Sequence, residues 1–155
     1  MKPRTRNFLV GLSVVIGGFL LIQLVPYRIS NPPVTAEPAW DSPQTRALVV
    51  AACFDCHSNE TKWPWYTNVA PVSWLVQRDV ESGRAQFNFS EWNKPQDVGA
   101  GDIADVIRGG SMPPWYYTII HRNANLSSAE KAALIAGINA TFAKSPPLGG
   151  GGGGG

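Results

Sequence analysis

The hydrophobic positions of this chain fall into one continuous run near the N-terminus and several amphipathic stretches further along. The continuous run, FLVGLSVVIGGFLLIQLV from Phe8 to Val25, contains no charged residue in 18 positions. This length is at the short end of what crosses the core of a bilayer as a helix. Lys2, Arg4 and Arg6 precede the run. By the positive-inside rule, residues 1–25 are then a cytoplasmic stub with a transmembrane helix, and the rest of the chain lies outside.

The same run could belong to a cleaved signal peptide. Such peptides have an apolar region of about 7 to 15 residues followed by small residues at the cleavage point. Here Pro26, Tyr27 and Arg28 follow the run, and the only passable cleavage sequence, Val34-Thr35-Ala36, lies well past it. A buried core helix is also disfavoured, because the run is apolar on every face and has a basic flank. We therefore expect a retained signal anchor.

Proline dominates the next stretch, with five prolines between positions 26 and 43. Such a composition predicts a stiff, extended tether over residues 26–42 rather than a folded element. Ser42 is a good N-cap, and Pro43 suits the first position of a helix. The pattern therefore predicts a helix from Pro43 to Ala52, at the start of a domain over residues 43–145.

Helical periodicity returns in three later stretches: Val69–Arg84, Asp102–Arg108 and Leu126–Ala143. Gly109 and Gly110 should end the second stretch, and Ser127 and Glu130 form a capping box at the start of the third. Residues 85–100 are polar and aromatic and should be irregular. No alternating run predicts a strand. Residues 146–155, which end in seven glycines, are expected to form a flexible tail.

Charge is distributed unevenly between the two ends of the chain. Residues 1–36 carry four basic residues and no acid, for a net charge of +4. Residues 37–155 carry nine basic and eleven acidic residues, for a net charge of −2. The exported part is mildly acidic and has no basic run, so the sequence gives no support for nucleic-acid binding.

Both cysteines of the chain lie in the sequence CFDCH, at Cys53 and Cys56, with His57 directly behind them. A disulfide oxidoreductase also uses C-x-x-C, but usually near a βαβ pattern, and it has no need for the histidine. A structural zinc site needs four ligands. The only other histidine, His121, lies far downstream, so zinc fits this sequence poorly.

A covalently bound haem accounts for all three residues, because C-x-x-C-H is the attachment signature of c-type haem. The two thiols add to the two vinyl groups, and the histidine that follows reaches the iron on the proximal side. Export of the domain fits as well, since this haem is attached outside the cytoplasm. The motif therefore predicts one haem c, attached at Cys53 and Cys56, with His57 as an iron ligand.

Met112, in the stretch RGGSMPPWYY, is the candidate for the second axial ligand. Glycines before it and prolines after it indicate a shaped loop, and a thioether is a known ligand of haem iron. The other methionine, Met1, lies on the opposite side of the expected membrane. Two alternatives remain open: Met112 fills an apolar gap, or His121 is the distal ligand.

The chain resembles the bacterial haem-binding domain family, small monohaem proteins related to class I cytochromes c. The resemblance rests on CFDCHSNETKWPWY, APVSWLV, GRAQFNFSEW, GSMPPWYY and LSSAEKAALIAGI, and it covers about Trp40 to Phe142. It implies an all-α, cytochrome c-like domain around one haem, with Cys53 and Cys56 as attachment points, His57 proximal and Met112 distal. It does not imply a substrate.

Aromatic side chains are more numerous than a small helical domain needs for its own core. The set is Trp63, Trp65, Tyr66, Trp74, Trp115, Tyr116 and Tyr117. We expect these side chains to shield the haem from water, although ordinary core packing explains some of them. Arg108 is either a partner for a haem propionate or a solvated surface residue. Asn88-Phe89-Ser90 and Asn125-Leu126-Ser127 match the glycosylation pattern, but we interpret them as polar turns.

Together these features predict a membrane-anchored monohaem cytochrome on the outer face of a bacterial cytoplasmic membrane. It would carry single electrons between redox proteins of the membrane or the periplasm, as a carrier rather than a catalyst. Two alternatives use the same residues. One is a sensor or peroxidase-like module with a displaceable sixth ligand, and the other is an auxiliary haem subunit of a respiratory or photosynthetic complex.

Overall fold

The computed structural model describes residues 2–25 and 30–149. The chain divides into two compact units. The smaller unit comprises the residues up to Ser30 together with Trp63–Asp79, and the larger unit comprises Asn31–Lys62 and the residues from Val80 onward. Residues 26–29 of the expected tether and residues 150–155 of the expected tail lie outside the described residues.

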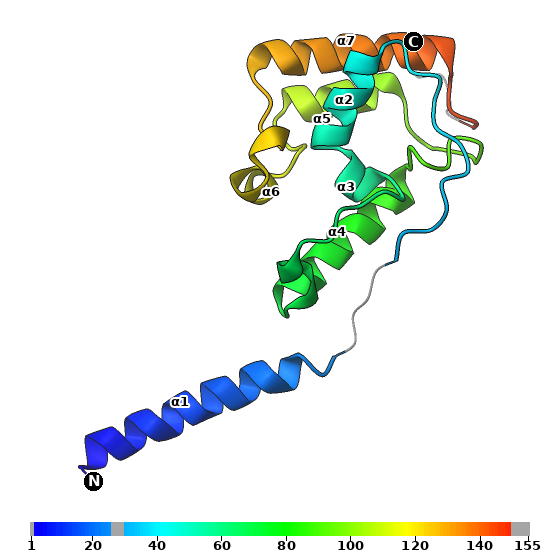
Figure 1. Ribbon diagram of the computed structural model, residues 1–155. Helices are drawn as coiled ribbons and strands as arrows, with labels where there is room; N and C mark the ends of the chain where they lie inside the picture. Colours follow the sequence, from blue (N-terminus) through cyan, green and yellow to red (C-terminus); the bar gives the residue numbers. More distant parts are fainter. Residues whose placement is uncertain (1, 26–29, 150–155) are drawn as a thin grey trace. The chain divides into compact units, whose positions relative to one another are not determined.

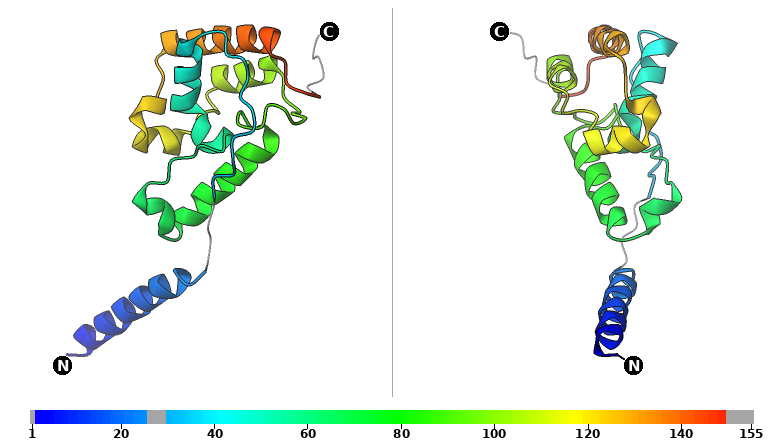
Figure 2. Two further views of the ribbon diagram at one scale, coloured as in Figure 1. Left: turned by 45° about the vertical axis from the view of Figure 1, so that its right-hand side comes forward. Right: turned by 90° about the vertical axis from the view of Figure 1, so that its left-hand side faces the viewer.

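Every regular element in the described part of the chain is helical, which confirms the all-α prediction (Figures 1 and 2). The α-helices are α1 Pro3–Ile22, α2 Pro43–Ala52, α3 Phe54–His57, α4 Val72–Gln86, α5 Ala100–Arg108, α6 Trp115–Ile120 and α7 Ser128–Lys144. Two short 3₁₀ helices are η1 Trp65–Asn68 and η2 Arg122–Ala124. Only isolated bridges, with no strand, occur within residues 2–25 and 30–149.

Local capping signals explain where the main helices of the larger unit begin. The Ser42 side chain accepts a hydrogen bond from the Thr45 backbone N–H, and Pro43 occupies the first helical position of α2. At the start of α7, the Ser127 side chain accepts from the Glu130 N–H while the Glu130 carboxylate accepts from the Ser127 N–H. Both of these helix starts were predicted from the sequence.

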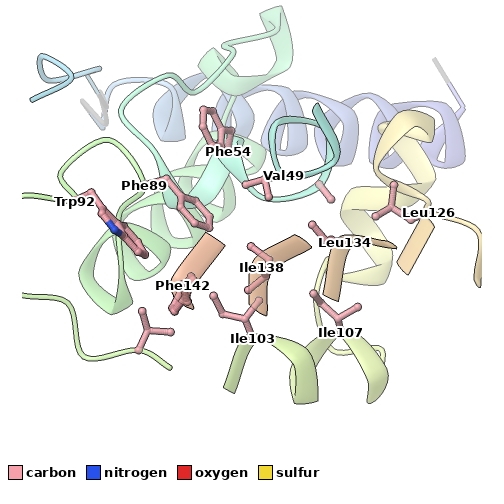
Figure 3. Packing of buried hydrophobic residues seen from close by; sticks show 12 residues of the cluster. Val49, Phe54, Phe89, Trp92, Ile103, Ile107, Leu126, Leu134, Ile138 and Phe142 are labelled. Atoms are coloured by element: carbon pink, nitrogen blue, oxygen red, sulfur yellow. The ribbon is translucent and has the colours of Figure 1, made fainter. Parts of the chain in front are cut away.

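The core of the larger unit is formed where α2 and α5 pack against α7 (Figure 3). Its buried side chains come from these three helices, from α3, from the segment after α4 and from the residue pair before α7: Val49, Phe54, Phe89, Trp92, Ile103, Ile107, Leu126, Leu134, Ile138 and Phe142. Helices α2 and α7 approach so closely that a Cβ atom at Gly137 would overlap the Thr45 side chain. This packing provides a rigid support for the turn that follows α2.

Residues 31–42 form no helix or strand, but they pack against the larger unit. The Thr35 backbone N–H donates to the Ser90 carbonyl at 2.9 Å, and Ala36 forms a parallel bridge with Glu91. The Trp40 ring lies 5.3 Å from the Phe89 ring. This part of the proline-rich stretch, expected as a tether, is therefore ordered against the domain. Proline stiffness alone did not indicate what the segment would pack on.

The smaller unit contains α1, η1 and the first half of α4. α1 is long and apolar enough to cross a membrane, by length and composition. It runs over Pro3–Ile22, so it begins before the apolar run and ends within it.

Candidate functional site

The sequence Cys53–His57 forms a single helical turn directly after α2. Cys53 ends α2 through its N–H bond to the Val49 carbonyl at 2.8 Å, and it also precedes α3. The Cys53 carbonyl then accepts from the N–H groups of Cys56 at 3.2 Å and of His57 at 2.8 Å. The three chemically distinctive side chains are thus held on one turn, which is anchored to the core by α2.

Both cysteines of this turn are half-buried, and no disulfide is present in the described part of the chain. Burial, together with the neighbouring Cys56, raises the pKa of Cys53 to about 12. Cys53 is therefore a protonated thiol at neutral pH, which keeps it less open to oxidation than a thiolate.

His57 is buried, with an exposed fraction of 7%, and its ring orientation is set by Phe87. The two rings stack with centroids 4.1 Å apart and an angle of 13° between their planes. Nδ1 lies 3.4 Å from the Phe87 carbonyl oxygen, which can only accept a hydrogen bond. This contact favours the tautomer with its proton on Nδ1 and an unprotonated Nε2, the form in which a histidine can bind a metal.

Burial also lowers the pKa of His57, although backbone carbonyls of Phe87 and Gly83 partly oppose this effect. A lowered pKa keeps the imidazole neutral at physiological pH. Neutral imidazole is the form that coordinates iron, so the state of this side chain suits a metal ligand.

Gly83 allows the second half of α4 to approach the CFDCH turn. A Cβ atom at this position would lie 2.5 Å from the Cys56 carbonyl oxygen, which is far inside normal contact distance. Only glycine therefore fits here without a shift of either helix. The sequence contains Gly83 within the helical stretch Val69–Arg84, but periodicity alone did not mark it as part of the site.

Arg84 connects α4 to the loop that follows the turn. Its Nε donates to the Ser58 carbonyl at 2.8 Å, and its Nη2 donates to Thr61 Oγ1 at 3.0 Å and Asn31 Oδ1 at 2.9 Å. This arginine was not among the predicted site residues, since no local motif distinguishes it from a surface arginine.

A buried amide network supports the turn from the other side. The Asn88 side chain donates to Asn59 Oδ1 at 2.8 Å and accepts from the Ser90 N–H at 2.9 Å. Gln96 Oε1 accepts from the Asn88 N–H at 2.9 Å. All four side chains are at least 95% buried. The Asn88–Ser90 stretch is a polar turn, as expected, closed by the Glu91 N–H bond to the Asn88 carbonyl at 3.1 Å, and it is buried rather than exposed.

Tyr117, on α6, contacts the turn directly. Its hydroxyl donates a 2.6 Å hydrogen bond to Asp55 Oδ2. Asp55 Oδ1 accepts from the Lys62 backbone N–H at 3.0 Å, so both carboxylate oxygens are used. The helix that follows Met112 is therefore fixed to the middle of CFDCH. Tyr117 was expected to belong to the aromatic shield, but its hydroxyl bond was not foreseen.

Met112 lies in the loop between α5 and α6 and is half-buried. Gly110 has a φ of +70°, which favours glycine, and it turns the chain after α5. The N–H groups of Ser111 and Met112 then donate to the Val106 carbonyl at 3.1 and 3.2 Å. The loop is thus held at both ends, by α5 before the methionine and by the Tyr117 bond after it.

The other predicted residues of the larger unit lie near this loop in the sequence. Arg108 forms an ion pair with Asp105 at 3.1 Å and is exposed. Trp115 is also exposed, with an exposed fraction of 72%. His121 ends α6, and its ring lies 4.0 Å from the ring of Tyr117. His121 thus packs against Tyr117, whose hydroxyl contacts Asp55.

The remaining aromatic candidates belong to the smaller unit: Trp63, Trp65, Tyr66 and Trp74. Trp65 is 79% exposed and contacts Tyr66 with ring centroids 5.9 Å apart. Trp74 is half-buried, and its indole Nε1 has no hydrogen-bond partner among the described residues.

The residues of the turn fit a haem. A buried neutral histidine with Nδ1 directed to a carbonyl leaves Nε2 for iron, and two thiols lie on the same helical turn. The zinc alternative has no such support, because no group of three or more His, Cys, Asp or Glu side chains suited to a metal ion occurs among residues 2–25 and 30–149.

Comparison with known proteins agrees with this geometry. Residues 17–140 match the family described as "Haem-binding domain". No curated protein and no solved structure matches the chain. The matched range includes the CFDCH turn, the methionine loop and most of α7.

Proposed function

This chain belongs to the haem-binding domain family and is a haem protein, and we propose that it is a membrane-anchored monohaem c-type cytochrome that carries single electrons. In this proposal Cys53 and Cys56 would hold the haem covalently, and His57 and Met112 would be the iron ligands. The partners are redox proteins of a membrane electron-transfer chain. The family match supports haem binding, and the residues of the chain support the finer assignment.

The observation that carries the proposal is the state of His57. The side chain is buried, stacked on Phe87 and directed through Nδ1 to a backbone carbonyl. Such a contact holds the ring orientation, as second-shell partners do at other metal sites. Covalent attachment of a haem also explains why two cysteines lie three residues apart on the same turn.

Electron transfer is favoured over catalysis by the second ligand. A haem bound by a histidine and a methionine would supply a one-electron couple of raised potential. The chain offers Met112 on a loop held by Val106, Gly110 and the Tyr117–Asp55 bond. A loop held in this way limits movement of the thioether, which suits a carrier better than a site that must open for a substrate.

The membrane location rests on α1 and the charges before it. The helix has the length and composition of a span, and Lys2, Arg4 and Arg6 before it support a start on the cytoplasmic side. The larger unit would then lie on the outer face, where c-type haem is attached.

Absorption spectroscopy of the haem-loaded protein tests the ligand set. We expect a methionine-to-iron charge-transfer band in the oxidised form, and we expect Met112→Ala to remove it and let the reduced protein bind carbon monoxide. Met112→His should keep the iron six-coordinate at a lower potential. His121→Ala serves as the control and should leave the spectrum nearly unchanged. If His121→Ala changes the ligand bands and Met112→Ala does not, the proposed ligand set and the raised potential are wrong.

A further inference from the structure

Within the smaller unit, the end of α1 is bonded to a distant segment of the chain. Gln23, the C-cap of α1, donates from Nε2 to the Ala70 carbonyl at 3.1 Å and accepts at Oε1 from the Ala70 N–H at 2.9 Å. Nε2 also donates to the Phe19 carbonyl at 3.0 Å. The amide thus satisfies both backbone groups of Ala70, which is 97% buried.

This double hydrogen bond places Ala70 at the end of the expected membrane span. The apolar run continues to Val25, three residues beyond the end of α1, so the chain should leave the hydrocarbon core close to Gln23. Residues next to Ala70 should therefore lie at the depth of the lipid headgroups.

The residues on either side of Ala70 have the composition of a membrane interface. From Trp63 to Arg78 the chain contains three tryptophans, one tyrosine and no acidic residue, and its only charge is Arg78 at the end. Tryptophan and tyrosine are enriched at the membrane–water boundary, where their amphipathic rings sit among the headgroups.

Several apolar side chains in this segment are exposed, so they are available to contact lipid. The exposed fractions are 79% for Trp65, 41% for Val72 and 43% for Leu75. At the end of α1, Leu24 is exposed by 75%. Val72 and Leu75 are three residues apart on α4, so they lie on one face of the helix.

We propose that Trp65, Val72 and Leu75 form a lipid-contacting surface, which we call the interfacial surface, and that the Gln23–Ala70 bonds fix it beside the end of α1. The inference rests on the membrane anchorage in the proposed function. It assigns Trp65 to lipid, whereas the sequence suggested a place in the haem shield. The smaller unit would then be seated on the membrane at two places rather than joined to it by one helix.

Photo-crosslinking of the full-length, haem-loaded protein in phosphatidylcholine vesicles tests this surface. The photoreactive residue p-benzoylphenylalanine replaces Trp65 in one sample and Trp115 in a matched control. Trp115 is also an exposed tryptophan, but it belongs to the larger unit. We expect several-fold more phospholipid adduct at position 65 than at position 115, measured by mass spectrometry of the digested protein. Equal adduct at both positions, or protein adducts alone at position 65, would overturn the proposal.

A second variant tests the role of Gln23. Gln23→Met keeps the length and flexibility of the side chain but removes the amide. It should lower the lipid adduct at position 65 several-fold, whereas Gln44→Met, at an exposed position of α2, should leave it unchanged. An unchanged adduct in Gln23→Met would show that the bonds to Ala70 do not position the surface.

Two further readouts separate this inference from the proposed function. Resistance to alkaline carbonate extraction reports whether the chain is integral to the membrane. If carbonate extracts the protein, the chain is not anchored in the membrane, and both the proposed membrane anchorage and the interfacial surface are wrong. An integral protein with no lipid adduct at position 65 contradicts the interfacial surface alone. Trp65→Ala should also leave the haem absorption spectrum unchanged, because a haem-contacting tryptophan would shift it.

Discussion

The hydroxyl of Tyr117 donates a 2.6 Å hydrogen bond to Oδ2 of Asp55, which joins the helix after the methionine loop to the CFDCH turn. The two residues are 62 positions apart in the sequence. The bond therefore ties together the two parts of the chain that are proposed to supply the axial ligands. Its acceptor is a carboxylate, which makes it stronger than a bond between neutral groups.

A double-mutant cycle measures what this bond contributes. Tyr117→Phe and Asp55→Ala should each destabilise the protein, and the double variant should be less destabilised than the sum, with a coupling of about 1.5 to 3 kcal/mol. Urea unfolding of the haem-loaded proteins gives the four free energies. The cycle removes the separate loss of the Lys62 bond in Asp55→Ala. A coupling near zero would mean that the bond does not hold the loop to the turn.

Gly83→Ala should disrupt the contact between α4 and the turn. The new Cβ atom would lie 2.5 Å from the Cys56 carbonyl oxygen, so one of the two helices must move. We expect a loss of about 1 to 3 kcal/mol in unfolding free energy, together with less haem bound per chain. Gly101→Ala is the matched control, because a Cβ atom at that α5 position meets nothing within 4 Å. The control should be neutral or more stable, by up to about 1 kcal/mol.

The two sequences that match the glycosylation pattern should respond differently to the same substitution. Asn88→Ala removes the partner of Asn59 Oδ1 and of the Ser90 N–H in a buried setting, so it should cost about 2 to 3 kcal/mol or more. Asn125→Ala, at an exposed position, should stay within about 0.5 kcal/mol of the parent. Thermal and urea unfolding of both variants gives the comparison. Equal effects at the two sites would contradict the buried network.

Stability should depend on pH through Glu37. Hydrogen bonds from Arg46, and to a lesser extent from the Trp40 indole, lower the pKa of Glu37, while burial opposes them. A lowered folded-state pKa gives stability that is present above the unfolded value of about 4.3 and is lost as the pH falls through the lower folded value.

The parent should therefore be more stable than Glu37→Gln at neutral pH, and their free energies of unfolding should converge in acid. The difference should be under about 1 kcal/mol, because the pair is partly exposed and screened by solvent. Urea unfolding from pH 7 down to about pH 3 follows this change across the window set by the usual Glu pKa. A difference that stays constant over that range would rule out the ionised pair as its source.

The helices that could be predicted are those with strong local signals. Ser42 with Pro43, the Gly109–Gly110 pair and the Ser127–Glu130 box mark ends that the structure confirms within one or two residues. Helix α6 was missed because WYYTII has no apolar periodicity. The packing of residues 31–42 was also missed, since its partners Phe89 and Ser90 lie about fifty positions away in the sequence.

The candidate site likewise contains residues that could be predicted from the sequence and residues that could not. CFDCH is a local motif, so the three residues of the turn could be named from the sequence. Their supports are long-range: Phe87 orients His57, Gly83 admits α4, and Tyr117 bonds Asp55. Such partners depend on tertiary packing, which residue spacing in one sequence does not encode. The amide network around the Asn88 turn was not predicted for the same reason, because its partners are brought together only in the folded chain.

Intact mass spectrometry of the denatured protein tests the central claim most directly. The claim is that one haem is bound covalently through Cys53 and Cys56. After acid denaturation and solvent extraction, the account predicts a single species with the mass of the chain plus one haem. Variants Cys53→Ala and Cys56→Ala should each retain one link, and the double variant should lose the haem completely. A parent protein that appears at the mass of the bare chain would contradict the account.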